Sequence, residues 1–408
     1  MEKDHVPTSP LLATLIERGF VHQATDVAGL DRLASAGPIV AYIGFDLTAP
    51  ALHVGSLIQL MVLRHLKAHG HEPVVLFGDA TTRVGDPSDK NGARPILTRG
   101  TIETNRTGIV RIVDRIVGHC RHVHNSEWLD GMSLDDFLQG PARHFTLNRM
   151  LSMDIVSRRL DANMPMTIAE LCYSMIQGID FAELSRRLGV TLQIGGSDQW
   201  SNIIAGMELA RRDDGRSLFG LTTPLMLDPQ GRKMGKTADG KAIWLDGEKT
   251  TAFDLWQFFR NVPDELVPRF LAWFTDLPME QVRELSTRTG ADLNEVKSVL
   301  ATQATTIVHG PEAAMAAERS ARTAFGGAEG DMPALAVPCE RTVAEALIEA
   351  GFATSKGDAR RLAAGGGVRV DGERFDAVDR RLSDGMPSSF RLAAGRRRIV
   401  RIDVIKED

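Results

Sequence analysis

The sequence predicts an α/β protein in which a doubly wound, Rossmann-like parallel-sheet domain is followed by a helical domain and a small α+β module. Over roughly the first 230 residues, short apolar runs suited to buried parallel strands alternate with segments of helical period. From about residue 250 the period is helical. Near the C-terminus, two short helical patterns precede a hairpin signal.

The first strand–helix–strand unit begins with the apolar run 38–45. From His53 to about His69, apolar side chains recur at helical spacing, and Gly70 favours a helix end. Residues 73–77 form the next apolar run. This order implies two parallel strands joined by a helix.

Two later apolar runs, 190–194 and 219–227, predict further strands, and a helix between them is expected to start near Ser197. We expect a mostly helical insertion over about 125–190. The Rossmann-like domain is therefore predicted to cover residues 1–240.

A helical domain is predicted over 241–324. Its aromatic side chains cluster between Phe253 and Phe274 at mixed helical spacings, which favours a helix core over a base-stacking platform.

The C-terminal part is predicted to be a separate module over 341–408. Residues 325–338 are rich in Gly, Pro and Ala, which predicts a linker over 325–340. Within the module, Asp371-Gly372 indicates a hairpin turn between short strands.

Composition excludes several classes of protein. No apolar run approaches the roughly 18–20 residues of a membrane span, and the charged, proline-containing N-terminus has no signal-peptide pattern. Cys120, Cys172 and Cys339 are far apart and have no metal-ligand spacing. We therefore expect no disulfide scaffold and no structural zinc site, and we expect a cytoplasmic location.

The net charge of −5 by itself argues against nucleic acid as a partner. The charge is uneven, however, because residues 339–408 carry 14 Lys and Arg against 12 Asp and Glu. An acidic body with a mildly basic tail leaves room for a local RNA-binding module, although a difference this small is also expected by chance.

The loop after the first strand, from Tyr42 to Leu57, is a candidate ligand site, because ligands of open α/β sheets bind at the carboxyl ends of strands. His53 can donate to phosphate oxygens, and Gly55 would let a base or sugar approach the backbone closely. For an isolated His-x-Gly, a polar residue near a helix N-terminus is the favoured interpretation.

A second candidate is the loop Gly231–Thr237, which contains Lys233 and Lys236. Two lysines three residues apart can clamp a polyphosphate and stabilise negative charge on a leaving pyrophosphate. The loop is not a Walker A motif, because Gln230 stands where its first glycine would be. Taken alone, a lysine-rich turn is more often a solvated surface loop.

The segment 195–200 lies between a predicted strand and a predicted helix. Gly196 would let a ribose approach, and Asp198 can accept hydrogen bonds from its hydroxyls. Alternatively, Ser197 and Asp198 cap the following helix.

Tyr173, Gln177 and Asp180 follow the spacing i, i+4 and i+7, which places them on one face of a helix. Three polar groups among apolar neighbours indicate a specific polar pocket. The alternative is a buried hydrogen-bond network.

In their order and spacing, these segments resemble bacterial tyrosyl-tRNA synthetases over nearly the whole chain. The likeness rests on a HIGH-type segment at His53–Ser56, the GlyAspPro turn at 85–87, Tyr173…Gln177…Asp180, GlyGlySerAspGlnTrp at 195–200 and a KMSKS-type loop at 233–237. Ser56 stands in place of the second histidine of HIGH, and Gly235 in place of the central serine of KMSKS. Residues 341–405 resemble an S4 RNA-binding domain.

The resemblance implies a class I ligase that works in two steps. ATP and L-tyrosine, with Mg²⁺, would give tyrosyl-adenylate and pyrophosphate, and the tyrosyl group would pass to the 3′ end of tRNA(Tyr). No protein ligand for the metal is assigned. The family also implies a homodimer.

The resemblance also implies roles for individual residues. Those expected to bind tyrosine are Tyr42, Gly44, Asp46, Asp86, Tyr173, Gln177, Asp180 and Gln199. Those expected to bind ATP are His53, Gly55, Ser56, Gly196, Asp198 and Lys236. Those expected to stabilise the reacting phosphates are Thr48, His53, Lys90, Arg94, Lys233 and Lys236.

Within the tyrosine set, Tyr42 and Asp180 would bind the phenol, and Asp86, Tyr173 and Gln177 would hold the ammonium group. Selectivity against phenylalanine would follow, because a missing hydroxyl leaves Tyr42 and Asp180 without a partner. In the S4-like module, the residues expected to face RNA phosphates are Lys356, Arg360 and Arg361.

Two alternatives remain. A tryptophanyl relative shares the fold and motifs, but it usually lacks an S4 tail and has no need of the Tyr42/Asp180 pair. A non-catalytic, synthetase-like RNA-binding protein is disfavoured by the intact His53, Lys233 and Lys236.

Overall fold

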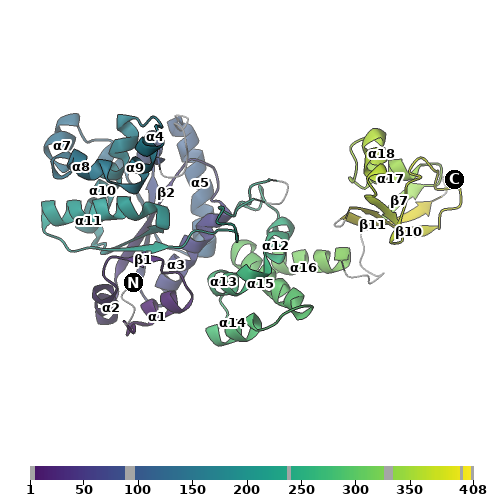
Figure 1. Ribbon diagram of the computed structural model, residues 1–408, viewed down its shortest axis with the longest axis horizontal. Coiled ribbons are helices and arrows are strands. Elements are labelled where there is room, and N and C mark those ends of the chain that lie inside the picture. The colour runs from purple at the N-terminus through teal and green to yellow at the C-terminus, as the bar shows by residue number, and fades with distance from the viewer. Residues whose placement is uncertain (1–4, 88–96, 237–239, 326–333, 396–397, 406–408) are drawn as a thin grey trace. The chain divides into compact units, whose positions relative to one another are not determined.

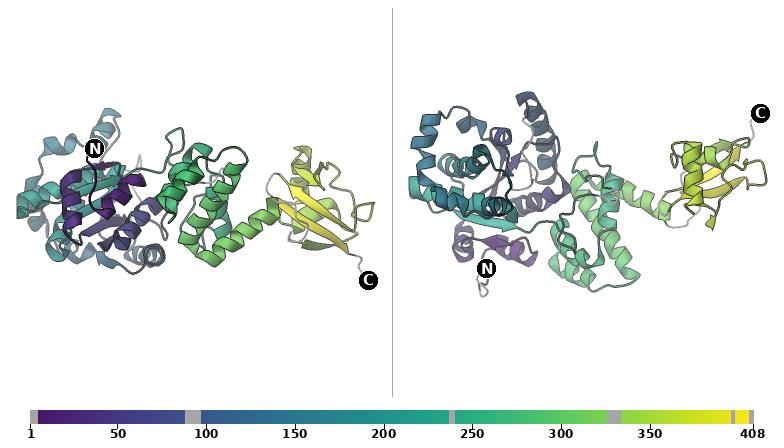
Figure 2. Two further views of the ribbon diagram at one scale, coloured as in Figure 1. Left: turned by 90° about the horizontal axis from the view of Figure 1, so that it is seen from below. Right: turned by 45° about the horizontal axis from the view of Figure 1, so that its top comes forward.

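The computed structural model divides into two compact units, residues 1–314 and 315–408, which we describe separately (Figures 1 and 2). The described residues are 5–87, 97–236, 240–325, 334–395 and 398–405.

The first unit contains a six-stranded sheet with the order β1–β6–β5–β2–β3–β4. The strands are β1 (Gln23–Ala24), β2 (Val40–Asp46), β3 (Glu72–Gly78), β4 (Arg121–His124), β5 (Leu192–Gly196) and β6 (Phe219–Thr223). The chain adds β3 and β4 on one side of β2, then β5 and β6 on the other, which confirms the doubly wound fold. β1 pairs antiparallel with β6, so the sheet is mixed rather than wholly parallel.

The predicted strand–helix–strand unit is confirmed. β2 and β3 pair in parallel, with Tyr42 opposite Val74. Between them, η1 (Val54–Ser56) leads into α3 (Leu57–Ala68), which ends just before Gly70. α3 is amphipathic, and its apolar residues, such as Leu57, are buried.

Helices cover both faces of the sheet (Figure 1). α3 packs with α5 (Arg99–Ile116) on one face, and α10 (Ile168–Leu188) packs with α11 (Trp200–Asp214) on the other. α10 starts at a capping box formed by Thr167 and Glu170. α11 follows η4 (Ser197–Gln199), so the helix predicted to start near Ser197 is confirmed.

Short helices fill the segment between β4 and α10. They are α6 (Ser126–Leu129), α7 (Leu134–Gln139), η3 (Pro141–His144), α8 (Leu147–Leu151) and α9 (Asp154–Asp161). The same unit also contains α1 (Pro10–Glu17), α2 (Val27–Ala36) and α4 (Thr81–Val84).

Strand β6 ends at Thr223, so the prediction that it would reach residue 227 is wrong. Pro224 follows, and proline has no N–H with which to continue the strand ladder. Strands β1 and β4 were not predicted, because two and four residues are too few to show a period.

The chain after residue 250 is helical, as predicted. Its helices are α12 (Ala252–Arg260), η5 (Asp264–Leu266), α13 (Val267–Phe274), α14 (Met279–Ser286), α15 (Asp292–His309) and α16 (Pro311–Phe325). Phe259, Phe270, Trp273 and Phe274 are buried, and the centroids of their contacting rings lie 5.1 to 6.4 Å apart. The aromatic cluster is therefore a helix core, as predicted.

Besides most of α16, the described part of the second unit contains a five-stranded sheet, of order β7–β11–β10–β8–β9, with the helices α17 and α18. The elements are β7 (Ala334–Pro338), α17 (Val343–Glu349), α18 (Lys356–Ala364), β8 (Val368–Val370), β9 (Glu373–Arg374), β10 (Ser389–Ala394) and β11 (Arg398–Ile405). Asp371 and Gly372 have φ of +50° and +89° and join β8 to β9, which confirms the hairpin turn.

The predicted linker is wrong at its C-terminal end. Ala334–Pro338 is strand β7, which pairs in parallel with β11. Because its partner β11 lies at the end of the chain, no local sequence pattern indicates this pairing. Residues 326–333 of the predicted linker lie outside the described residues.

Candidate active site

The candidate site lies at the carboxyl ends of β2 and β5, where the strand order reverses. β2 carries Tyr42, Gly44 and Asp46, and β5 ends at Gly196. The long helix α10 packs over the same side of the sheet as Tyr42. Strands β2 and β5 thus bring together segments that are far apart in the sequence.

Tyr42 and Asp180 lie in the interior and are 1% and 2% exposed. The ring of Tyr42 packs against Phe181, with centroids 5.3 Å apart. Its buried hydroxyl has no hydrogen-bond partner in the described part of the chain. Burial, together with the nearby Asp180, keeps the pKa of Tyr42 well above its usual value. A ligand hydroxyl placed here would satisfy this otherwise unpaired group.

Two side chains that follow β4 hold the carboxylate of Asp180. Asn125 donates from Nδ2 to Oδ2 at 3.1 Å, and Trp128 donates from Nε1 to Oδ1 at 2.9 Å. Burial raises the pKa of Asp180 to about 7, and these two hydrogen bonds oppose the rise. The carboxyl group therefore changes its charge near neutral pH.

A chain of hydrogen bonds leads from Asp180 to Tyr173. Asn125 Nδ2 also donates to Thr81 Oγ1 at 3.0 Å, and Thr81 Oγ1 donates to Asp46 Oδ1 at 2.9 Å. The hydroxyl of Tyr173 donates to Asp46 Oδ2 at 3.1 Å. Burial raises the pKa of Tyr173, so this hydroxyl stays a neutral donor. The chain fixes the polar side chains on both sides of the site.

Hydrogen bonds also connect the start of α11 to the turn that follows α4. Gln199 Nε2 donates to Asp86 Oδ2 at 2.9 Å, and Asn202 Nδ2 donates to Gln199 Oε1 at 3.1 Å. The structure therefore brings together two residues, Asp86 and Gln199, that the sequence assigned to the same ligand.

His53 lies against the predicted lysine loop. Its ring packs edge-on against Trp244, with centroids 5.7 Å apart. A Cβ at Gly235 would lie 1.8 Å from His53 Cε1, so the ring occupies the space that any other residue would fill. The loop is tied down through its backbone, because Ile243 donates to the carbonyl of Gly235 and Val54 donates to that of Ile243, both at 2.9 Å.

The two lysines of this loop act on Asp198 and His53, which belong to the other predicted motifs. Lys233 Nζ lies 3.1 Å from Asp198 Oδ2, in an ion pair. Burial lowers the pKa of His53; a hydrogen bond with the backbone of Gly235 opposes this, and the charge of Lys236 adds to it. The imidazole is therefore neutral at pH 7. Lysine, histidine and carboxylate groups from three separate motifs thus form one cluster.

The helix-capping alternative for Ser197 and Asp198 is not supported, because neither η4 nor α11 has a side-chain cap hydrogen bond. Asp198 is paired with Lys233 instead. Ser56 stands at the N-cap of α3 and also makes no side-chain capping bond.

The remaining predicted residues fall into three groups. The first group lies on β2, η1, α10 and β5 or directly after β2, and comprises Gly44, Gly55, Gln177, Gly196 and Thr48. Two, Lys90 and Arg94, lie outside the described residues. The predicted RNA-binding cations lie on α18 and are exposed, but each pairs with a carboxylate of its own unit: Lys356 with Glu345 at 3.0 Å, Arg360 with Asp379 at 2.8 Å and Arg361 with Asp358 at 3.3 Å.

Sequence reasoning missed Thr81, Asn125 and Trp128. Asn125 and Trp128 come just after β4, and Thr81 comes just after β3, so all three sit at the carboxyl edge where ligands bind. Recognition of β4 as a strand would have pointed to the first two.

Among the described residues, one group has the composition of a metal site: Asp114, Cys120 and His122, whose ligand atoms lie within 4.8 Å of one another. His122 Nε2 lies 3.2 Å from Asp114 Oδ1, a contact that needs no metal, and burial raises the pKa of the Cys120 thiol to about 11. We therefore assign no metal to this group. In the described part of the chain, no helix is both long and apolar enough to cross a membrane.

The family model for class I tRNA synthetases (W and Y) matches residues 34–326. A tyrosine–tRNA ligase of Rhodospirillum rubrum is 46% identical over 414 residues, which cover 98% of this chain and 99% of the relative. One from Pseudomonas aeruginosa is 47% identical over 403 residues, 96% of this chain and 97% of the relative. The chain belongs to the tyrosyl-tRNA synthetase family.

Solved structures agree with this tyrosyl-tRNA synthetase assignment. A C-terminally truncated mitochondrial tyrosyl-tRNA synthetase from Coccidioides posadasii superimposes with a TM-score of 0.66 at 29% identity, over 76% of this chain and 91% of that one. The tryptophanyl-tRNA synthetase of Plasmodium falciparum shares the fold, with a TM-score of 0.55 over 75% of this chain and 84% of that one, but only 14% of the sequence. The resemblance read from the motifs is therefore confirmed, and the tryptophanyl alternative is disfavoured.

Proposed function

We propose that this chain is a tyrosine–tRNA ligase, which forms tyrosyl-adenylate from L-tyrosine and ATP and transfers tyrosine to the 3′ end of tRNA(Tyr). The observation that carries the proposal is the buried, unpaired hydroxyl of Tyr42 beside Asp180. Together they form a receptor for a phenol at the ligand-binding edge of the sheet. Phenylalanine would leave the buried hydroxyl of Tyr42 without a partner and would offer Asp180 no further donor, which is costly.

The ammonium group of tyrosine would lie between Asp86, Tyr173 and Gln177. Asp86 supplies the negative charge, and Gln199, which donates to Asp86, lies next to it. The hydrogen bond from Tyr173 to Asp46 fixes the orientation of the Tyr173 ring. We expect the substrate carboxylate to lie toward the nucleotide side of the site.

Activation needs no general base, because the substrate carboxylate is already a nucleophile. The side chains have to position it and to stabilise charge on the α-phosphate and the leaving pyrophosphate. We assign this to Thr48, His53, Lys233 and Lys236, joined by Lys90 and Arg94. Gly196 and Asp198 would face the ribose, and Gly55 and Ser56 the adenosine.

We propose that Mg²⁺ arrives bound to the phosphates of ATP. Magnesium at nucleotide sites keeps water and phosphate oxygens as most of its ligands. Asp198, which contacts the lysine loop, is already paired with Lys233. We therefore assign no side chain as a metal ligand.

We propose that the second unit binds tRNA through α18. Because Lys356, Arg360 and Arg361 are each paired with a carboxylate, an RNA phosphate would have to displace or share that partner. Removing the residues after Phe325 should leave adenylate formation intact and greatly weaken aminoacylation at ordinary tRNA concentrations. Full charging by the truncated chain would contradict this role.

We propose a cytoplasmic homodimer whose contact surface comprises the segment between β4 and α10 together with the first residue of α10. Large apolar side chains are exposed there; Leu134 is 73% exposed and Ile168 75%. Leu138 and Leu147 extend the surface. Light scattering should show a dimer for the natural chain and a monomer for Ile168→Asp. A monomeric natural chain would contradict the proposal.

Amino-acid-dependent exchange of labelled pyrophosphate into ATP tests the central proposal. We expect exchange with tyrosine and almost none with tryptophan or phenylalanine. Exchange with tryptophan would mean that Tyr42 and Asp180 do not bind a phenol. If no amino acid supported exchange, the non-catalytic RNA-binding interpretation would replace the ligase.

A further inference from the structure

We propose that Arg159 is a positioning residue for the amino-acid site, because it holds the turn that carries Asp86 against the start of α10. The inference rests on the proposed function, in which Asp86 binds the ammonium group of tyrosine. Arg159 lies on α9 and does not belong to any motif recognised in the sequence.

The guanidinium of Arg159 is buried and links three segments. Its Nη1 donates to Glu170 Oε1 at 2.9 Å and to the carbonyl of Pro165 at 3.4 Å. Its Nη2 donates to the carbonyl of Pro87 at 3.4 Å. Since Pro87 directly follows Asp86, one side chain connects α9, the first turn of α10 and the predicted ammonium site.

Glu170, which accepts a hydrogen bond from Arg159, is itself held in place. Glu170 Oε2 accepts hydrogen bonds from the backbone N and from Oγ1 of Thr167, at 2.9 and 3.0 Å, in the capping box that starts α10. Burial would raise the pKa of Glu170, but the hydrogen bonds from Thr167 and Arg159 outweigh it and leave the pKa below its usual value. Arg159 therefore pairs with a carboxylate that is charged and held in place.

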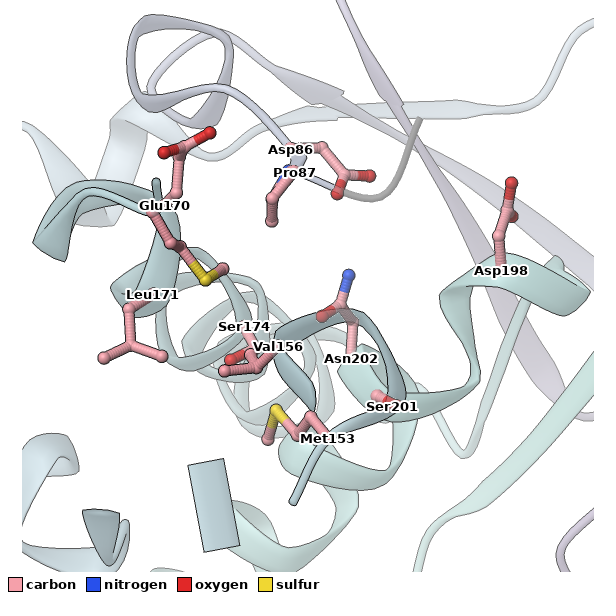
Figure 3. A pocket seen from close by; sticks show the side chains of 11 residues that line it. Asp86, Pro87, Met153, Val156, Glu170, Leu171, Ser174, Asp198, Ser201 and Asn202 are labelled. Atoms are coloured by element: carbon pink, nitrogen blue, oxygen red, sulfur yellow. The ribbon is translucent and has the colours of Figure 1, made fainter. Parts of the chain in front are cut away.

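A small cavity adjoins the turn. A cavity of about 20 Å³, enough for about one water molecule, lies between Asp86 and Pro87 on one side and Glu170, Ser174 and Asn202 on the other (Figure 3). In Figure 3 the carboxylate of Asp86 points away from Glu170. Polar contacts reach the turn at both residues, from Arg159 at Pro87 and from Gln199 at Asp86.

Two variants separate positioning from folding. Arg159→Lys keeps a charge beside Glu170 but lacks the second nitrogen that reaches Pro87. Arg159→Met combined with Glu170→Leu removes the buried ion pair as a whole, which proteins often tolerate, whereas removing one partner leaves an unpaired buried charge. Arg158→Met is the matched control, because Arg158 is an exposed neighbour on α9 that donates to the carbonyl of Asp154.

The test measures KM for tyrosine, KM for ATP and kcat in pyrophosphate exchange. It also measures inhibition by 3-(4-hydroxyphenyl)propionate, which has the phenol but no ammonium group. We expect both Arg159 variants to raise KM for tyrosine about tenfold, which is the effect of losing one hydrogen bond to a charged group. KM for ATP and inhibition by the propionate should change little, and Arg158→Met should behave like the natural chain.

Asp86→Asn distinguishes failure of this inference from failure of the proposed site. If Asp86→Asn weakens tyrosine binding but the Arg159 variants do not, the positioning role is overturned and the site stands. If the Arg159 variants weaken tyrosine and the propionate equally, Arg159 has a general structural role and the inference is also overturned. If Asp86→Asn leaves tyrosine binding unchanged, the assigned ammonium site fails and the inference fails with it.

Discussion

The indole nitrogen of Trp128 donates a hydrogen bond to the Asp180 carboxylate at 2.9 Å, and both groups are buried. The bond stabilises the charged form of a carboxylate whose burial favours the neutral form. In the proposed site, Trp128 would therefore contribute to phenol binding through Asp180, without any need to touch the substrate.

Replacing Trp128 with Phe should raise KM for tyrosine. The ring volume is nearly kept, but Asp180 loses one of its two donors, so its pKa rises and the carboxylate accepts less well from the phenol. We expect a loss of about tenfold in kcat/KM for tyrosine, typical of one hydrogen bond to a charged group. Steady-state exchange kinetics measure it.

Trp256→Phe is the matched control for this prediction. The Nε1 of Trp256 donates to Thr302 Oγ1 at 2.9 Å in the helical part of the first unit, so the change also removes one indole hydrogen bond. An equal loss of tyrosine activity in both variants would contradict a specific role for Trp128.

Tyrosine binding should depend on pH through Asp180. Because the pKa of Asp180 is about 7 in the free protein, a proton competes with the phenol below that pH. Binding favours the carboxylate, so KM for tyrosine should fall as the pH rises from 6 to 8. At pH 6.5, binding should release up to about one proton.

Calorimetry in buffers of different ionisation enthalpy measures this proton release directly. The variant Asp180→Asn has no carboxylate to titrate, and its weaker binding should show no proton release. Release that persists in Asp180→Asn would assign the titration to another group and contradict the role of Asp180.

Much of the site was visible in the sequence because its motifs are local. His53, Lys233 and Asp198 each belong to a short segment of recognisable composition, and the order of strands and helices predicts the sheet edge where they meet. The hydrogen-bond partners were not visible. Asn125 and Thr81 reach the site only through the pairing of β3 with β4, which brings together residues far apart in the chain.

The same reasoning explains the error at the start of the second unit. The segment Ala334–Pro338 has the composition of a linker, and it becomes a strand because β11 offers an edge with which it can pair. The pairing of distant segments overrides local composition here.

Replacing Gly235 with Ala should impair activation. A Cβ at this position would lie 1.8 Å from His53 Cε1, so the lysine loop has to move away from the histidine. Small displacements of phosphate-binding groups are costly, and we expect kcat/KM for ATP to fall about 100-fold. Exchange kinetics at varied ATP measure the change.

Gly231→Ala is the control for Gly235→Ala. Gly231 has a φ of +78°, where alanine is strained, but no atom lies within 4 Å of its added Cβ. It therefore introduces backbone strain in the same loop without the collision. If the two variants lost the same activity, strain in the loop rather than contact with His53 would be the cause.

Two glycines of α5 should respond in opposite ways to alanine. At Gly108 an added Cβ would lie 2.0 Å from the carbonyl oxygen of Pro50, so α5 has to move away from the loop that follows β2. At Gly100, no atom lies within 4 Å of an added Cβ.

We expect Gly108→Ala to lower the free energy of unfolding by about 1–3 kcal/mol, as overpacking does. Gly100→Ala should raise it by up to about 1 kcal/mol through higher helix propensity. Thermal unfolding midpoints measure both changes. A midpoint for Gly108→Ala at or above that of Gly100→Ala would contradict the close approach of α5 to Pro50.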